Sequence, residues 1–329
     1  MKIRVVIGVC VVLAAMAILL PAGPQKKVQA RSQDAAAGSG APSLSNPLKV
    51  ALLKWYNANT VPTEFPVGNQ PYGMAFDSAN IWVAAFDGTV TKVRANDGAV
   101  LGTFQIGGAL YGVTFDGSSV WVSNLSGSVT KLRASDGKIL GTFSVGSNAG
   151  WMAFDGVNIW VPFGQNSVAK LRASDGSNTG TFTVGLAPIT AAFDGENVWV
   201  VAGGGNSPGN VTKLRASDGH LLGTFVVGYS PIGIAFDGAD MWVANSGSGT
   251  VTELRASDGA TVGTYAVAGG PYGVAFDGKD IWVTGSPYIN ILRASDGGLI
   301  QRLGPASTTG VAFDGANIWV SLNNTVGKL

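Results

Sequence analysis

Acidic side chains are the most numerous candidates for chemistry in this chain, and most of them recur at one of two repeated positions. The sequence contains 17 Asp and 3 Glu. General acid–base catalysis or metal binding needs groups that differ between repeats, whereas a scaffold repeats the same group. We therefore interpret thirteen Asp as structural, seven that follow a Phe and six in a second Asp-Gly turn: Asp77, Asp116, Asp155, Asp194, Asp237, Asp277 and Asp314, then Asp97, Asp136, Asp175, Asp218, Asp258 and Asp296.

The remaining reactive residues do not form an evident cluster. His220 is the only histidine and follows an Asp-Gly turn, and Cys10 is the only cysteine. This shortage argues against Ser-His-Asp or Cys-His catalysis and against a zinc or copper site. The Gly-rich strings precede no helix, so they are not phosphate loops. The sequence predicts no catalytic residue, no metal site and no cofactor.

A repeat of about forty residues organises the chain. A Phe-Asp pair occurs seven times, at spacings of 39, 39, 39, 43, 40 and 37 residues, and a Trp follows each Phe by six positions. This period, with one Trp per unit between Gly and Asp turns, is typical of β-propeller blades. We expect the Trp side chains to form the core between blades. The units lie near residues 69–107, 108–146, 147–185, 186–228, 229–268, 269–304 and 305–329.

Each unit divides into four strands, and the last unit lacks its fourth. The residues from Thr63 to Gly68 (TEFPVG) match the fourth-strand pattern from Gly102 to Gly107 (GTFQIG). A strand from this N-terminal stretch, residues 59–68, would complete the last blade and remove a free sheet edge. The sequence therefore predicts an all-β fold, a seven-bladed β-propeller of four-stranded antiparallel blades whose last blade is completed by an N-terminal strand.

Basic residues also repeat, on the third strand of each unit. Because this strand ends on the same face as both Asp-Gly turns, we expect a rim of surface Arg–Asp contacts, for example Arg133 with Asp116 or Asp136. An anionic-ligand surface is the alternative, but the neighbouring Asp residues would cancel its field.

The N-terminal segment has the order of a secretory signal. Lys2 and Arg4 precede an apolar run from Val5 to Leu20, and small or aliphatic residues near Ala30 would suit a signal peptidase. We expect an exported protein, periplasmic, cell-surface or extracellular, with no membrane embedding after cleavage; an uncleaved anchor is the alternative. The predicted domains are a signal peptide at 1–30, a flexible linker at 31–49 and the propeller at 50–329.

Net charge makes a nucleic-acid partner unexpected. The formal charge is +1, but five of the 21 basic residues lie in the leader: Lys2, Arg4, Lys26, Lys27 and Arg31. Without them, 16 basic residues stand against 20 acidic residues, a net charge of −4. Nucleic-acid binding normally needs a basic surface.

The repeat resembles known bacterial propellers. The stretch PIGIAFDGADMWVANSGSGTVTELRASDG, from Pro231 to Gly259, resembles the YVTN and NHL families, a broad group that includes the streptogramin (virginiamycin B) lyases. The resemblance covers residues 60–329 and implies the propeller fold. Because these families include binding, surface and redox-associated proteins and a few enzymes, it implies no single function. A lyase of this group would be expected to use more than one His with a Glu, and this chain has only His220.

The two faces of the predicted propeller differ. The first-to-second and third-to-fourth strand turns emerge on one face, the repeat face, and are nearly the same in every unit. The other loops emerge on the opposite, variable-loop face, whose aromatic and amide side chains suit a protein, peptide or glycan partner. The alternative is that these loops vary because nothing constrains them. The predicted ligand-binding residues are Tyr72, Tyr111, Trp151, Ile232 and Tyr272 near the central mouth, and Asp87, Asn124, Gln165 and Tyr288 farther out.

Three functional hypotheses follow from these patterns. The first is an exported, monomeric, non-enzymatic binding or scaffold propeller. The second is a lyase or hydrolase of the streptogramin-lyase-like group, which would need a central cluster of His, Glu, Asp or Asn. The third is a cell-surface structural protein.

Overall fold

The computed structural model describes residues 63–203, 207–304 and 306–329. The predicted signal peptide, the predicted linker and the part of the predicted propeller before residue 63 lie outside the described residues. None of the described residues forms a helix that is long and apolar enough to cross a membrane.

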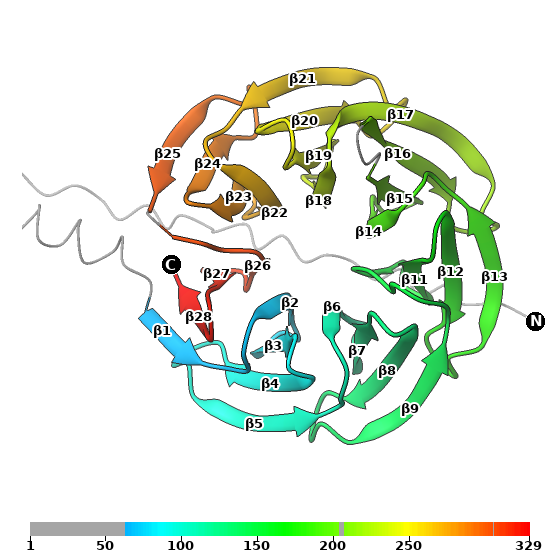
Figure 1. Ribbon diagram of the computed structural model, residues 1–329, viewed down its shortest axis with the longest axis vertical. Coiled ribbons are helices and arrows are strands. Elements are labelled where there is room, and N and C mark those ends of the chain that lie inside the picture. Colours follow the sequence, from blue (N-terminus) through cyan, green and yellow to red (C-terminus); the bar gives the residue numbers. More distant parts are fainter. Residues whose placement is uncertain (1–62, 204–206, 305) are drawn as a thin grey trace, which may run out of the picture. The chain divides into compact units, whose positions relative to one another are not determined.

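Twenty-eight strands in these ranges form seven four-stranded antiparallel sheets, which are the blades of a ring (Figure 1). Blades 1 to 3 consist of β2 (Pro71–Phe76), β3 (Asn80–Ala85), β4 (Thr89–Arg94) and β5 (Val100–Gln105); β6 (Leu110–Phe115), β7 (Ser119–Asn124), β8 (Ser128–Arg133) and β9 (Ile139–Ser144); β10 (Ala153–Phe154), β11 (Asn158–Phe163), β12 (Ser167–Arg172) and β13 (Asn178–Thr183).

Blades 4 to 7 follow the same order from the inner to the outer strand. They consist of β14 (Pro188–Phe193), β15 (Asn197–Ala202), β16 (Pro208–Arg215) and β17 (Leu221–Tyr229); β18 (Pro231–Phe236), β19 (Asp240–Asn245), β20 (Thr250–Arg255) and β21 (Thr261–Ala266); β22 (Gly270–Phe276), β23 (Asp280–Ser286), β24 (Ile289–Arg293) and β25 (Leu299–Leu303); β26 (Val311–Phe313), β27 (Ile318–Ser321), β28 (Thr325–Lys328) and β1 (Thr63–Pro66).

The ring closes through the N-terminal strand β1. It pairs antiparallel with β28, with Thr63 opposite Lys328 and Pro66 opposite Thr325. Beyond the strand, the Val67 amide donates to the Asn324 carbonyl at 3.0 Å. The predicted fold class is confirmed, including completion of the last blade by an N-terminal strand.

The position of a strand within its blade explains its sequence pattern. The second strand β3 (NIWVAA) is buried at every residue, because neighbouring blades cover both of its faces. The outer strand β5 (VLGTFQ) is exposed except at every second residue from Gly102, because only one side of it faces the core. The Trp of the second strand therefore lies in the interior between two blades.

The Trp side chains form this core, as predicted. Six of the seven are fully buried at 0% exposure, and Trp282 is partly buried. Each of the six packs on an aromatic ring of the fourth strand, with ring centroids 5.4–5.6 Å apart. In blade 6 the residue at this fourth-strand position is Leu303, opposite Ile289.

Each Phe-Asp carboxylate binds the Trp of its own blade. The indole Nε1 of all seven Trp donates to this Asp at 2.6–2.8 Å. In blade 2, Asp116 also accepts from the amides of Ser118 at 2.9 Å and Ser119 at 2.6 Å. Burial alone would raise the pKa of Asp116, but these hydrogen bonds and that from Trp121 outweigh burial and lower the pKa. The repeated Asp is structural because it satisfies a buried indole and caps a turn.

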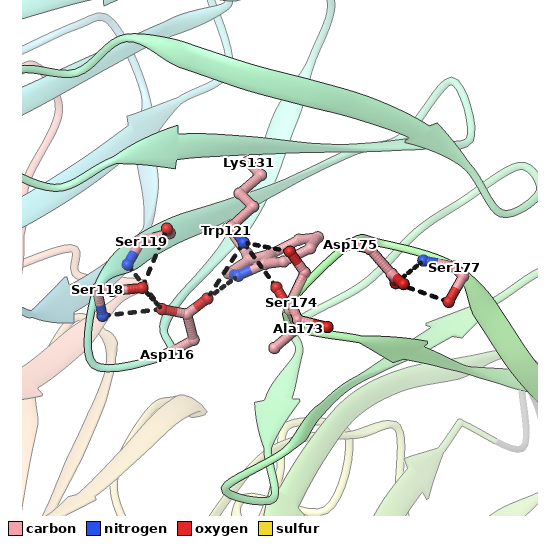
Figure 2. Close-up of polar contacts among 9 residues, drawn as sticks. All are labelled: Asp116, Ser118, Ser119, Trp121, Lys131, Ala173, Ser174, Asp175 and Ser177. Atoms are coloured by element: carbon pink, nitrogen blue, oxygen red, sulfur yellow. Dashed lines mark hydrogen bonds and ion pairs between the residues drawn. The ribbon is translucent and has the colours of Figure 1, made fainter.

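Five lysines of the third strands, the junction lysines, join each blade to the next one. Figure 2 shows Lys131 of blade 2, whose Nζ donates to the Ala173 carbonyl of blade 3 at 2.6 Å and lies 3.9 Å from the Asp116 carboxylate. The same Nζ lies 5.0 Å from the centre of the Trp121 ring. The corresponding Nζ–carbonyl distances are 2.6–2.7 Å throughout, and the junction lysines are Lys92, Lys131, Lys170, Lys213 and Lys328.

Two junctions of the ring depart from this pattern. Lys328 joins blade 7 to blade 1 through the Ala95 carbonyl at 2.7 Å. In blade 5, however, Glu253 occupies the lysine position opposite Trp242, and in blade 6 Ile291 occupies it. The junctions from blade 5 to blade 6 and from blade 6 to blade 7 therefore lack the ammonium group.

Glu253 is buried where other blades bury a cation. Its side chain accepts a hydrogen bond from the Tyr265 hydroxyl at 2.6 Å. Burial raises the pKa of Glu253; the bond from Tyr265 opposes this rise, and the negative charges of Asp240 and Asp237 add to it. The folded protein therefore holds the Glu253 proton more tightly than the unfolded chain does.

The predicted rim of Arg–Asp contacts is present on the repeat face. Arg133 lies 3.4 Å from Asp136, one of its two predicted partners, and five other blades have the same pair at 2.7–3.1 Å. Both side chains of each pair are about half exposed, so solvent screens the attraction and each pair contributes little to stability.

Replacing a junction lysine should weaken the contact between two blades. We expect Lys131→Met to destabilise the protein by about 1–3 kcal/mol, because the Ala173 carbonyl loses its charged donor. Urea unfolding measures this change, and Lys138→Met, an exposed lysine in a turn, is the matched control. Equal stabilities of the two variants would contradict the role of the junction lysines.

Placing a lysine at position 253, at the junction from blade 5 to blade 6, should stabilise the ring near neutral pH. A group with a raised folded-state pKa stabilises most below its unfolded pKa, about 4.3 for Glu, and this stability is lost as pH rises through the folded pKa. We expect Glu253→Lys with Tyr265→Phe to be more stable than the parent at pH 7 by about 1–3 kcal/mol, with the gain shrinking toward pH 4. Unfolding at several pH values tests this. Glu196→Lys makes the same charge change in an exposed turn, and an equal gain there would contradict the explanation.

Candidate functional site

Four aromatic side chains meet at the centre of the variable-loop face and form the central aromatic cluster. Tyr72, Tyr111 and Tyr272 lie at the start of the inner strands β2, β6 and β22, and Trp151 lies two residues before β10. Inner strands run from the variable-loop face toward the repeat face, so residues near their start lie at the mouth of the ring. Trp151 is held by a backbone bridge to Thr190 of β14.

The rings of this cluster contact one another across the axis. Tyr111 lies 4.2 Å from Trp151 and 5.2 Å from Tyr72 between ring centroids, and Trp151 lies 5.8 Å from Tyr272. The hydroxyls of Tyr111 and Tyr272, from blades 2 and 6, are hydrogen-bonded at 3.1 Å. Burial, and then the neighbouring Tyr272, raises the pKa of Tyr111. Burial also raises the pKa of Tyr272. Both hydroxyls therefore stay protonated at neutral pH.

A cavity of about 150 Å³ lies beside the cluster and opens to solvent. Three of the four aromatic side chains line it, together with aliphatic side chains, two Thr and three Gly from the inner strands. None of its lining side chains is charged. The aromatic and aliphatic lining residues include Tyr72, Trp151, Tyr272, Met74, Met152 and Ile234.

The shape of this centre depends on whether the inner strand has a Gly after the mouth position. At Gly73, Gly112, Gly233, Gly273 and Gly310 an added Cβ would meet the backbone of the next inner strand, so Gly allows the strands to approach closely. Blades 3 and 4 carry Met152 and Thr190 instead. Both residues line the cavity.

The structure brings only part of the predicted site together. Tyr72, Tyr111, Trp151 and Tyr272 form the cluster. Ile232 lies on β18, outside the cavity lining, and its carbonyl accepts from the Thr190 hydroxyl at 2.6 Å.

Two of the outer predicted residues hold their own loops. The Asp87 carboxylate accepts from the Asn69 amide at 2.6 Å and from the Thr89 hydroxyl at 2.6 Å. Asn124 is buried, donates to the Gly107 carbonyl at 2.8 Å and accepts from Ser126. Neither side chain reaches the cavity.

The other two outer residues lie apart from the cluster. Gln165 is exposed, and its backbone carbonyl accepts from the Ala187 amide at 2.6 Å. The Tyr288 ring lies under the Arg302 guanidinium, 5.6 Å from its centre. The structure thus places the four predicted outer residues in four different blades.

Sequence reasoning missed the floor of the cavity. The floor is lined by Met74, Met152, Thr190 and Thr309, and none of them is among the predicted ligand-binding residues. The signal for two of them is the loss of Gly from the repeat at Met152 and Thr190. For Met74 the sequence carries no comparable signal, because the position two residues after the mouth is apolar in every blade.

The part of the chain that the structure describes contains no cluster of metal-ligand side chains. No group of three His, Cys, Asp or Glu side chains gathers there in a way that could hold a metal ion. No model of a known protein family and no curated protein matches the chain. Because a propeller fold alone implies no single function, the function is inferred from the geometry of the central cluster and its cavity.

The role of Asp87 in holding the loop between β3 and β4 can be tested by substitution. We expect Asp87→Ala to lower stability by about 1 kcal/mol, because the Asn69 amide and Thr89 lose their acceptor. Thermal unfolding measures the change, with Gln165→Ala, an exposed side chain in the equivalent loop of blade 3, as the control. Unchanged stability would contradict the loop-holding role.

Proposed function

We propose that this chain is an exported, non-enzymatic binding propeller whose central aromatic cluster contacts the partner. The observation that carries the proposal is the convergence of Tyr72, Tyr111, Trp151 and Tyr272, from blades 1, 2, 3 and 6, beside an open, uncharged cavity. Concave sites of this kind, lined by aromatic rings with a few polar groups, are the usual places where proteins bind ligands.

The chemistry of the cluster favours binding over catalysis. Its tyrosine hydroxyls remain protonated at neutral pH, because burial raises the pKa of Tyr111 and of Tyr272. They can donate and accept hydrogen bonds but are poor general bases. The repeated Asp side chains lie on the opposite face, where Trp indoles and Arg guanidiniums occupy them.

Export and the kind of partner belong to the same proposal. The order of charged and apolar residues from Lys2 to Ala30 supports export. The resemblance to the YVTN and NHL propellers is compatible with a binding protein of the cell envelope. A protein, peptide or glycan partner suits the aromatic face, a nucleic acid does not suit a net charge of −4, and the protein is expected to act as a monomer.

Capture of partners from envelope extract tests the proposal. We expect the secreted protein to retain partners that a variant with Tyr72→Ala, Tyr111→Ala and Tyr272→Ala loses at least tenfold, because aromatic contacts at the centre of an interface dominate binding.

The matched control carries three changes on the repeat face, Arg94→Ala, Arg133→Ala and Arg172→Ala, and should keep its partners. Circular dichroism and thermal unfolding establish that both variants are folded. Equal recovery of partners by the parent and the folded tyrosine variant would remove this face as the binding site.

A further inference from the structure

No charged side chain lines the central cavity of the variable-loop face. Glu64 and Arg302 lie at strand ends on this face and do not line the cavity. In the described part of the loops on this face, Asp87 is the only charged residue. Its carboxylate is already occupied by the Asn69 amide and Thr89. An ionised ligand at the centre would lose its water without gaining an opposite charge, which is costly. The site therefore selects an uncharged group.

The size of the cavity limits that group to about one ring. A cavity of about 150 Å³ with no charged lining residue has the volume that accommodates a benzene-sized molecule. Met74, Val274 and Val311 supply aliphatic walls, and Tyr72 and Trp151 supply aromatic surface at the mouth. A sugar ring of this size would place several hydroxyls against these aliphatic walls with no partners, which disfavours it.

Several side chains at the cavity carry polar atoms, and the hydroxyls of Thr190 and Tyr272 are placed to bind a ligand hydroxyl. The Thr190 hydroxyl donates to the Ile232 carbonyl at 2.6 Å, which leaves its oxygen free to accept. Tyr272 lines the cavity, and its hydroxyl is paired with that of Tyr111, which does not line it. When Tyr111 donates in this pair, the Tyr272 hydrogen is free to donate into the cavity. The Thr190 oxygen and the Tyr272 hydrogen are then an acceptor and a donor for a ligand hydroxyl.

We propose that the central cavity binds one uncharged aromatic ring with a hydroxyl group, the chemistry of phenol. The inference rests on the proposed function, because it names the group that the same site recognises. The ring can belong to a free phenolic compound or to a tyrosine side chain of a partner protein.

Titration of the secreted protein with phenol at pH 7 tests the proposal. Calorimetry and saturation-transfer NMR measure the binding. We expect phenol to bind, and benzoate and benzylammonium, which are charged at this pH, to bind at least tenfold more weakly. N-acetyltyrosinamide distinguishes the sources: tighter binding than phenol indicates a peptide side chain, and weaker binding indicates a free phenolic compound. Glucose should not bind.

Variants that fill the cavity locate the binding. Val311→Phe should weaken phenol binding at least tenfold, and Met74→Phe serves the same purpose if the first variant does not fold. Tyr288→Ala, outside the cavity, is the control and should bind phenol like the parent. Absence of phenol binding to the parent, equal binding of benzoate, or unchanged binding by a folded cavity-filled variant would overturn the proposal.

The outcomes separate this inference from the proposed function. If partner capture depends on the tyrosines but phenol does not bind, the ring-binding inference fails and the binding face stands. If phenol binds in the cavity while the tyrosine variant captures partners normally, the cavity stands and the proposed binding face fails.

Discussion

The contact between neighbouring blades is the interaction on which the ring depends. At five of the seven junctions, a buried or partly buried lysine lies above a Trp ring and donates to a carbonyl of the next blade, while the Trp indole is held by the Phe-Asp carboxylate. The carboxylate thus satisfies the indole, and the carbonyl of the next blade satisfies the ammonium, inside a largely apolar boundary. Without disulfides among the described residues, this repeated unit and the aromatic packing around it hold the blades together. The same unit joins blade 7 to blade 1, so the closed edge is as well connected as an ordinary junction.

This way of joining blades places almost all charge on one face. The Asp of the first-to-second turn must reach the Trp, and the lysine must reach the next third-to-fourth turn, so both turns emerge on the repeat face. The Arg–Asp pairs of that face extend the same arrangement to the surface. The variable-loop face has no part in these contacts, and Asp87 is the only charged residue in the described part of its loops. The difference in charge between the two faces is therefore a consequence of how the blades are connected.

The sequence predicts most of the fold because a repeat presents the same physical requirement seven times. The Trp, the Phe-Asp pair and the closing TEFPVG stretch each have a repeated counterpart, and the structure uses them as their repetition indicated. The site is harder to predict from the sequence than the fold, because it lies where the blades differ from one another in sequence. Tyr72 and Tyr272 could be placed at the mouth from their position before the inner strand. The cavity could not, because its volume depends on which rings lean together across the axis and on how closely the inner strands approach. Asp87 and Asn124 stood out in the sequence because they vary, yet their side chains hold loops, which spacing alone does not reveal.

The mouth position shows why a symmetric ring needs an asymmetric centre. Seven inner strands bring seven side chains toward one axis, and seven large rings would not fit there. The chain places large aromatic rings at Tyr72, Tyr111, Trp151 and Tyr272, and smaller residues at Ile189, Ile232 and Thr309. The large rings contact one another over the axis, and the cavity lies beside them, with Thr309 among its lining residues. A mixture of large and small residues at one repeated position thus gives the repeat an asymmetric centre with a cavity. Binding at this centre therefore depends on that choice together with the residues just after it, such as Met152 and Thr190, because both sets line the cavity while the second strands are committed to the core between blades.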